Sequence, residues 1–228
     1  MSKHHMLQIN VAGANWCTHT ILNDLLFNNF DIILIQDPWW GKIGSQKTIN
    51  PDSHTIYGTN NSPNWLCIIP PGISDGEHPG VAIYICNHKD IGIHFSDITP
   101  SHLDILAIDI FINNSLSTII NIYPHGKTAS DTIDCITHIN PNCSCPTIIC
   151  GDFNTHHPEW ALIGSKWESK CPNTSTRALQ SFIENNQLCV MNNLSTPTHY
   201  HLNRPKSNLI IDLTLLNYSA INTWAKFN

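Results

Sequence analysis

Charge is scarce in this sequence, and positive charge most of all. Asp, Glu, Lys and Arg make up 12% of the 228 residues, and 17 acidic side chains against 11 basic ones give a formal net charge of −6. Non-specific affinity for nucleic acids comes mainly from Lys and Arg side chains that neutralise phosphates, so this composition argues against a broadly basic nucleic-acid-binding protein. If DNA is the substrate, a bound metal ion and local contacts must provide most of the binding.

Long apolar runs and regular cysteine spacing are missing as well. No run approaches the roughly 20 residues needed to cross a membrane, and no apolar segment follows a basic region in the order of a signal peptide. The nine cysteines are scattered, and Cys143-Ser144-Cys145 has no second pair at zinc-finger spacing. We therefore expect an intracellular, reduced and soluble protein with no membrane partner, and we infer no obligate protein partner.

The length and the 41% hydrophobic content predict a single α/β domain over residues 1–228. Apolar runs of strand length alternate along the chain with segments whose apolar residues recur at helical spacing. The region between residues 41 and 80 is rich in Pro, Gly, Ser and Asn, and we expect loops there around one short strand. The expected strands are 6–11, 31–36, 65–69, 80–85, 103–112, 116–123, 147–151, 188–191 and 207–215, with a turn at 113–115; the expected helices are 18–29, 130–140 and 174–186.

The stretch with the most chemistry is 147–160. An apolar, β-branched run ends at a glycine, and Asp152 and Asn154 then stand two residues apart. In an extended chain, residues i and i+2 point the same way, so these two side chains can share one small volume while Phe153 turns into the core. A carboxylate and a carboxamide suit a hard metal ion and a phosphate oxygen. Asp and Asn after a strand are also ordinary turn formers, and that alternative stays open.

Gly-Asp-Phe-Asn at the end of a hydrophobic strand resembles the motif of the endonuclease/exonuclease/phosphatase superfamily, which includes pancreatic deoxyribonuclease, abasic-site endonucleases, inositol polyphosphate 5-phosphatases and neutral sphingomyelinases. The continuation Thr-His-His-Pro-Glu-Trp is similar to the endonuclease domain of non-LTR retrotransposons, which nicks target DNA before reverse transcription. The resemblance implies a deoxyribonuclease-like, four-layer α/β sandwich of two packed mixed β-sheets flanked by helices. It also implies Mg²⁺ or Mn²⁺ as cofactor and DNA as substrate.

The resemblance assigns the metal to Asp37 and Asn10. Asp37 occupies the position of the family's glutamate, the principal metal ligand, and Asn10 matches an asparagine that positions the metal or the phosphate. The shorter side chain of Asp37 withdraws its carboxylate by about one carbon–carbon bond, and a displacement near 1 Å can cost about a hundredfold in rate. Hard cations accept aspartate as readily as glutamate, so metal binding remains expected. A strand-end asparagine such as Asn10 is also typical of a turn.

The remaining site residues also follow from the resemblance. Tyr123 matches the tyrosine that contacts the scissile phosphate, although an aromatic at this position also caps sheet edges. Asp152 and Asn154 would orient the nucleophilic water and the phosphate. Asp212 matches the aspartate that accepts a hydrogen bond from a catalytic histidine. His156 is a candidate phosphate or substrate contact, although adjacent histidines on a loop are more often one buried and one exposed.

One expected residue is missing from the sequence. The family's histidine, in a Ser-Asp-His run one strand beyond Asp212, does not occur before Asn228. His199 and His201 precede the Asp212 strand, and by chain order we expect them to be poor substitutes. The loss of an acid–base group costs roughly 10²–10⁴-fold in rate. We therefore expect a domain truncated at its C-terminus, without its last strand and its Asp-His motif, and with an open sheet edge or an incomplete core.

These residues support two function hypotheses. The first is a Mg²⁺- or Mn²⁺-dependent phosphodiesterase, the DNA-nicking endonuclease domain of a retrotransposon-derived protein, which would act in the nucleus. The alternative is a catalytically degenerate relic or binding module that keeps the fold without turnover. Phosphatase or sphingomyelinase activity is a weaker third hypothesis, because the residues after Gly-Asp-Phe-Asn resemble those of retroelements.

Overall fold

Two β-sheets with helices outside them form the computed structural model, which describes residues 4–46, 54–74, 76–112, 115–126, 129–141, 145–200 and 208–224. The elements in chain order are β1 (Met6–Asn10), α1 (Asn15–Asn23), η1 (Leu25–Phe27), β2 (Ile32–Gln36), β3 (Gly41–Gln46), β4 (His54–Gly58), β5 (Trp65–Ile68), β6 (Val81–Cys86), β7 (Gly92–Phe95), β8 (Ile105–Ile112), β9 (Ser115–Ile122), α2 (Ala129–His138), β10 (Thr147–Asp152), η3 (Pro158–Trp160), α3 (Thr174–Asn185), β11 (Cys189–Val190), β12 (Asp212–Leu216) and α4 (Tyr218–Trp224). Over these ranges no helix is long and apolar enough to span a membrane.

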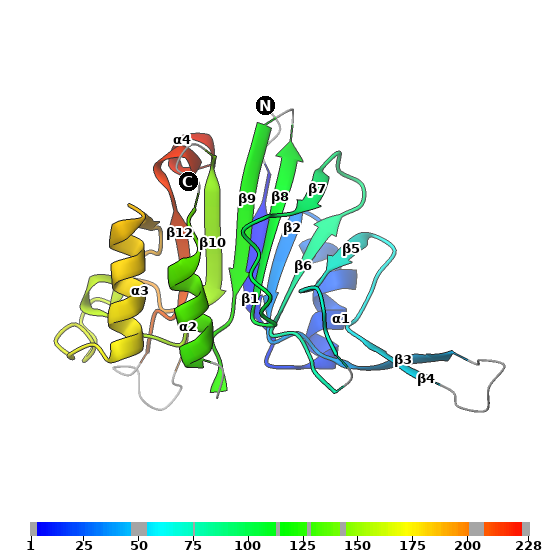
Figure 1. The fold of residues 1–228 in the computed structure, drawn as a ribbon, viewed down its shortest axis with the longest axis horizontal. Coiled ribbons are helices and arrows are strands. Elements are labelled where there is room, and N and C mark those ends of the chain that lie inside the picture. Colours follow the sequence, from blue (N-terminus) through cyan, green and yellow to red (C-terminus); the bar gives the residue numbers. More distant parts are fainter. Residues whose placement is uncertain are drawn as a thin grey trace.

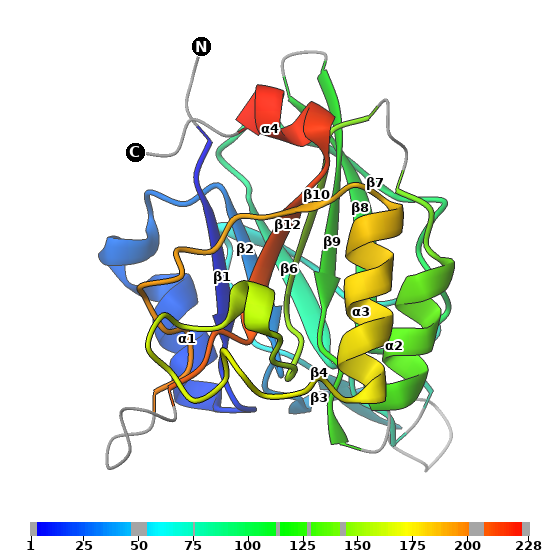
Figure 2. The ribbon, with the colours of Figure 1, turned by 90° about the vertical axis from the view of Figure 1, so that its left-hand side faces the viewer.

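The two sheets pack against each other as the inner layers of the molecule. In the described part of the chain, one sheet has four strands in the order β1-β2-β6-β5, and the other has six in the order β11-β12-β10-β9-β8-β7. Both are mixed, because β1 pairs with β2 and β9 with β10 in parallel while the other pairs are antiparallel. Figure 1 shows α1 outside the four-stranded sheet and α2 and α3 outside the six-stranded one, and Figure 2 shows α2 and α3 side by side. The expected four-layer α/β sandwich is confirmed.

Strand β2 shows why the sequence forms this inner layer. Its apolar residues are 0–1% exposed, as expected for a strand covered on both faces. Ile32 and Leu34 pack into the core between the sheets, whereas Ile33 and Ile35 pack with Ile21 of α1. The alternation follows from the two-residue period of a strand.

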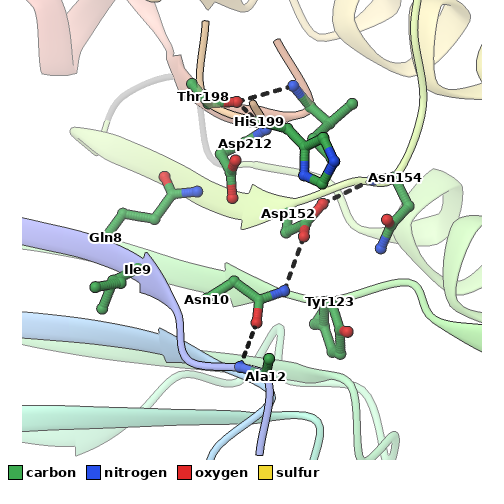
Figure 3. A pocket seen from close by; sticks show the side chains of 11 residues that line it. Gln8, Ile9, Asn10, Ala12, Tyr123, Asp152, Asn154, Thr198, His199 and Asp212 are labelled. Atoms are coloured by element: carbon green, nitrogen blue, oxygen red, sulfur yellow. Dashed lines mark hydrogen bonds between the residues drawn. The ribbon is translucent and has the colours of Figure 1, made fainter. Parts of the chain in front are cut away.

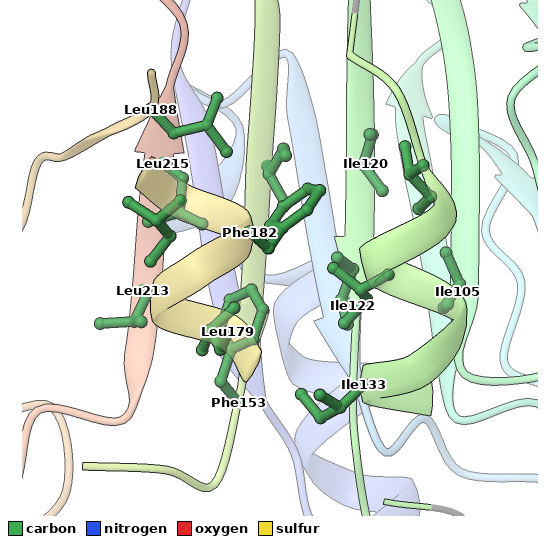
Figure 4. Packing of buried hydrophobic residues seen from close by; sticks show 14 of the residues in the cluster. Ile105, Ile120, Ile122, Ile133, Phe153, Leu179, Phe182, Leu188, Leu213 and Leu215 are labelled. Atoms are coloured by element: carbon green, nitrogen blue, oxygen red, sulfur yellow. The ribbon is translucent and has the colours of Figure 1, made fainter. Parts of the chain in front are cut away.

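A second apolar layer holds the six-stranded sheet against its helices. Ile120 of β9 and Leu213 of β12 belong to the same cluster as Ile133 of α2 and Leu179 and Phe182 of α3, and Figure 4 shows these side chains between the sheet and the helices. Each is at most 4% exposed, and burial of one such side chain contributes about 1.5–3 kcal/mol. This layer holds β9, β10 and β12 in the positions from which their ends can meet.

A buried polar link joins the two sheets. The Asn121 amide of β9 donates hydrogen bonds to the carbonyl oxygens of Ile35 on β2 and Ala82 on β6, each at 3.0 Å. Its oxygen accepts a hydrogen bond from Gln36 Nε2, and both amide side chains are fully buried. Hydrogen bonds between buried polar groups fix local geometry. The link therefore sets the end of β2 against the end of β9.

The expected helix over residues 18–29 was wrong in its extent. The α-helix ends at Asn23, and Asp24 has extended backbone angles. The Asp24 carboxylate accepts a hydrogen bond from the backbone N–H of Leu26, which starts the separate turn η1. Leu25 and Leu26, expected to pack inward, are 80% and 76% exposed. A short acidic side chain that caps a new turn has overridden the helical spacing of the leucines.

The region expected to be loops contains a β-hairpin instead. Strands β3 and β4 pair in antiparallel fashion and project from the body of the molecule in Figure 1. The glycines that suggested loops make room for side chains: a Cβ at Gly58 would lie 2.5 Å from Ile43 Cδ1, and one at Gly41 would lie 2.4 Å from the Trp39 ring. Strand β7 was also missed. The expected turn residues 113–114 lie outside the described residues.

Candidate active site

A pocket of about 490 Å³ opens where β1, β9 and β10 end and β12 begins. Figure 3 shows side chains from these strands pointing into one space. The lining residues are Gln8, Ile9, Asn10, Ala12, Tyr123, Asp152, Asn154, Thr198, His199, Ile211 and Asp212. They include every site residue expected from the sequence except Asp37 and His156.

Asp152 is the most constrained carboxylate in the pocket. It is 6% exposed and accepts hydrogen bonds from Asn10 Nδ2 at 2.8 Å and from the backbone N–H of Asn154 at 3.1 Å. The Asn154 amide donates in turn to the carbonyl oxygen of Pro124 at 3.0 Å, and Phe153 turns into the core as expected. The two readings of the motif are compatible here, because Asp152 caps a tight turn and also faces the pocket.

The backbone around the pocket is held in an unfavourable region. Ala12, Asp37 and Asn154 have φ angles of +50°, +50° and +51°, which cost roughly 1–2 kcal/mol each for residues with a Cβ. At Asp37 the backbone is fixed by a hydrogen bond from its N–H to Gly80 O and by another from the Gly13 N–H to its own carbonyl oxygen, both 2.8 Å. Strain of this kind persists only where the surrounding structure fixes it, and it clusters at functional sites.

Asp212 lies beside Asp152 because of the strand register. The two residues are direct partners in the antiparallel pairing of β10 with β12. The pKa of Asp212 is raised from 3.8 to about 6. Burial is the largest cause, the negative charge of Asp152 acts in the same direction, and a hydrogen bond with the Thr198 side chain opposes both. A carboxyl group with a raised pKa thus faces the pocket beside a second carboxyl group, an arrangement suited to acid–base chemistry.

Tyr123 lies just after β9, with its ring in the pocket wall. Burial raises the pKa of its hydroxyl; the charges of Asp37, Asp152 and Asp104 add to this, whereas a hydrogen bond with Asn10 lowers it. The ring stacks on His125, with centroids 4.8 Å apart and planes at 11°. The Tyr123 hydroxyl therefore stays protonated at neutral pH and can donate a hydrogen bond.

The two residues expected to hold a metal lie on the β1 side of the pocket. Asp37 does not line the pocket, but its carboxylate is close enough to raise the pKa of Tyr123. Asn10 connects the groups, since its Oδ1 accepts a hydrogen bond from the Ala12 N–H at 2.8 Å while its Nδ2 binds Asp152. In the part of the chain that the structure describes, no three His, Cys, Asp or Glu side chains are grouped as metal ligands. Mg²⁺ commonly takes only one or two carboxylates plus waters, so these oxygen donors fit a hard cation.

His156 lies outside the pocket lining, on the loop that follows the motif. Its ring packs against Trp167 with centroids 3.9 Å apart, and Lys166 and Lys170 lie over the same indole at 4.7 and 4.1 Å. Burial lowers the pKa of His156, and the two lysine charges lower it further. His157 is buried and caps η3 by accepting a hydrogen bond from the Glu159 N–H. One histidine of the pair is therefore structural.

Sequence reasoning missed one pocket residue that carries an imidazole. His199, which chain order had set aside, lines the pocket together with Thr198, and its ring lies close to Asp152 in Figure 3. The signal that could have found it is the Thr-Pro-Thr-His segment at 196–199, a polar stretch before the strand that begins with Asp212. His201 lies outside the described residues.

Comparison with known proteins agrees with this geometry. Residues 117–228 match the model of a protein family described as endonuclease-reverse transcriptase. Over 96% of its length the chain superposes on 87% of the endonuclease domain of TRAS1, a telomere-specific non-LTR retrotransposon, with a TM-score of 0.66 and 17% identity. Residues 117–228 therefore resemble this endonuclease family, and the chain shares the fold of the TRAS1 endonuclease domain. No curated protein matches it.

The superfamily fold extends to nucleases of other kinds. An AP endonuclease from Archaeoglobus fulgidus matches 95% of the chain with 87% of its own length, at a TM-score of 0.52 and 15% identity. At these identities the solved structures show the fold, which is that of a deoxyribonuclease-like domain. The resemblance inferred from Gly-Asp-Phe-Asn and its continuation is confirmed.

Proposed function

We propose that this chain hydrolyses phosphodiester bonds in DNA, as the nicking endonuclease domain of a protein derived from a non-LTR retrotransposon. The observation that carries the proposal is the convergence of Asn10, Tyr123, Asp152, Asn154 and Asp212 in one pocket. Each comes from a strand end or from the residues next to it, on four different strands, so only the folded domain assembles them. The match of residues 117–228 to the endonuclease-reverse transcriptase family supports the same reaction class.

Asp152 is suited to orient the attacking water. The two hydrogen bonds that it accepts, from Asn10 Nδ2 and the Asn154 N–H, fix the direction of its carboxylate. A fixed carboxylate in the pocket can accept a hydrogen bond from water and take its proton as the water attacks phosphorus. Asn154 is itself held by Pro124 O, so the turn keeps its geometry while substrate binds.

Tyr123 and Asp212 are suited to contact the phosphate from the other walls. The raised pKa of Tyr123 keeps its hydroxyl neutral and able to donate to a phosphate oxygen. Asp212, with a pKa of about 6, holds a proton more tightly than an exposed aspartate does and can donate it toward an oxygen bound beside Asp152. Donors fixed before substrate arrives stabilise negative charge that develops in the transition state.

A divalent ion, Mg²⁺ or Mn²⁺, held by Asp37 and Asn10 would neutralise charge on the phosphate and on the leaving oxygen. The oxygen donors of both residues fit such an ion. They lie beside Tyr123 and Asp152, which would contact the phosphate and the attacking water. Of the two expected metal ligands, Asn10 lines the pocket where the phosphate would bind, whereas Asp37 lies outside the lining.

The loop after the motif offers a contact for the DNA backbone. Lys166 and Lys170 flank the Trp167 indole, and His156 packs against its ring. In a chain with a net charge of −6, a local pair of lysines can neutralise phosphates where the protein as a whole cannot. We propose that this cluster, His156 included, binds substrate phosphates outside the pocket.

The proposal is tested by nicking of supercoiled plasmid. Purified full-length chain is incubated with Mg²⁺ or Mn²⁺, beside the same reactions in EDTA, and beside Asp152→Ala as the inactive control. We expect open circular product that requires metal and disappears in Asp152→Ala. Linear DNA or free phosphate as the first product would indicate a different activity, such as that of another nuclease or of a phosphatase.

A fold kept without turnover is the alternative. It is favoured by one observation, that Asp37 stands in place of glutamate and does not reach the pocket lining. The Asp37→Glu variant separates the two possibilities, because the longer side chain extends the carboxylate by about one carbon–carbon bond, and a correction of this size is worth about a hundredfold in rate. Nicking by Asp37→Glu but not by the natural chain would establish the degenerate form.

A further inference from the structure

The pocket contains an imidazole that chain order did not predict. Among the described residues that line it, His199 is the one histidine. Its ring lies near Asp152, on the side of the pocket opposite Asn10, in Figure 3. The side chain is exposed, so a ligand in the pocket can reach it.

The main chain holds His199 in place. Its N–H and its carbonyl oxygen both pair with Leu209, each at 3.0 Å, in an isolated antiparallel bridge. The neighbouring Thr198 hydroxyl accepts hydrogen bonds from the N–H groups of Ile211 and Asp212, each at 3.1 Å. Residues 198–199 are thus fastened to the segment that leads into β12, whose first residue is the register partner of Asp152. The ring can be removed without removing the hydrogen bonds that place it.

A second donor faces the same space from β1. Gln8 lines the pocket, and its Nε2 is buried with no hydrogen-bond partner, while its Oε1 accepts a hydrogen bond from the Thr214 hydroxyl at 3.5 Å. A buried amide N–H without a partner is costly, by roughly 1–3 kcal/mol. The unpaired Gln8 Nε2 is explained if an oxygen of a bound ligand accepts a hydrogen bond from it.

The other amide donors of the pocket are already engaged. Asn10 Nδ2 binds Asp152, and Asn154 Nδ2 binds Pro124 O. The pocket therefore combines two carboxyl groups with donors from Gln8 and His199. A phosphate oxygen is an acceptor of hydrogen bonds only, so it needs such donors to approach Asp152 and Asp212.

We propose that His199 and Gln8 bind the phosphate group of the substrate, with His199 contacting the oxygens next to Asp152 and Gln8 Nε2 donating from the β1 side. The proposal rests on the proposed phosphodiesterase function and adds two substrate-contacting residues to it. Neutral imidazole suffices, because one ring N–H donates a hydrogen bond. His199 thereby supplies an imidazole to the pocket from a segment that precedes β12 in the chain.

The kinetic test compares His199→Ala, His199→Asn and Gln8→Leu in the plasmid-nicking assay, with His88→Ala as the matched control. His88 is exposed, forms a hydrogen bond with Asn64 just before β5, and does not line the pocket. We expect His199→Ala to lower kcat by about 10²-fold, and His199→Asn, which keeps an N–H donor, to recover part of the loss. Gln8→Leu should lower the rate about fivefold, and His88→Ala should match the natural chain. The unfolding midpoints of His199→Ala, His199→Asn and His88→Ala should equal that of the natural chain.

A binding test does not depend on turnover. The full-length chain is titrated with inorganic phosphate while the histidine ring resonances are followed by NMR, and the His199 signal is identified by its loss in His199→Asn. We expect this signal to shift with phosphate, and His199→Ala to weaken phosphate binding, whether or not the chain nicks DNA. Phosphate binding without nicking would remove the proposed function and leave the phosphate site standing. A His199 signal that does not move, or full nicking by His199→Ala, would overturn the proposal.

Discussion

Asp212→Asn should stabilise the folded chain at neutral pH and leave its stability unchanged in acid. Folding raises the pKa of Asp212 from 3.8 to about 6, first through burial and then through the charge of Asp152. A group whose folded pKa is raised binds its proton more tightly in the folded state, so its contribution to stability falls as the pH rises from about 4 to about 6. The full shift corresponds to about 3 kcal/mol at pH 7 and above. An asparagine of similar size has no charge to bury and escapes this cost.

The assay is urea unfolding of the natural chain and Asp212→Asn at pH 4 and pH 8, in EDTA so that no bound metal changes the electrostatics. The free energy of unfolding of Asp212→Asn should exceed that of the natural chain by about 2–3 kcal/mol at pH 8, and the two should agree within error at pH 4. Asp109→Asn, on strand β8 and outside the pocket lining, is the control for removal of a carboxylate. Equal stabilities at pH 8, or the same gain at both pH values, would refute the electrostatic account of the Asp152–Asp212 pair.

Three further predictions concern the frame of the pocket. Gly151→Ala should lower the free energy of unfolding by about 1–3 kcal/mol, because the added Cβ would lie 2.2 Å from the Ile122 carbonyl oxygen; an unchanged urea midpoint would contradict the close approach of β9 and β10. Asn121→Leu should cost about 3 kcal/mol by leaving the Ile35 and Ala82 carbonyls without their donor, and a variant as stable as the natural chain would show that the buried link is dispensable. Asn10→Ala should lower nicking by about 10²-fold with little change in unfolding midpoint, since it removes the 2.8 Å hydrogen bond that orients Asp152; a rate within twofold of the natural chain would argue against that role.

The buried strands and the strand end that carries the motif were predictable because they depend on local patterns, whereas the layers of the fold followed from the superfamily resemblance. The apolar run of β2 is buried on both faces as its composition predicts, and a motif at the end of β10 lies where a strand presents its last side chains. The pairing of Asp152 with Asp212 could be expected only through the superfamily resemblance, because the two are 60 positions apart and no local pattern connects them.

The parts that sequence reasoning missed depend on contacts between distant segments or on single capping groups. Asp24 ends α1 with one side-chain hydrogen bond, which outweighs the helical spacing of the leucines after it. Gly41 and Gly58 were taken for loop residues, although they make room for Trp39 and Ile43 in a hairpin. His199 enters the pocket because its backbone pairs with Leu209, and an argument from chain order does not include that pairing.

The most direct test of the central claim is the rate of plasmid nicking by the natural chain relative to Asp152→Asn, both with Mn²⁺ and both shown to be folded by circular dichroism. Asn keeps the size of the side chain but removes the carboxylate that would take the proton from water, a change worth about 10²–10⁴-fold. We expect metal-dependent nicking by the natural chain and a rate lower by about 10²–10⁴-fold in Asp152→Asn. Equal rates for the two, or folded natural chain and Asp37→Glu that both fail to nick, would contradict the central claim.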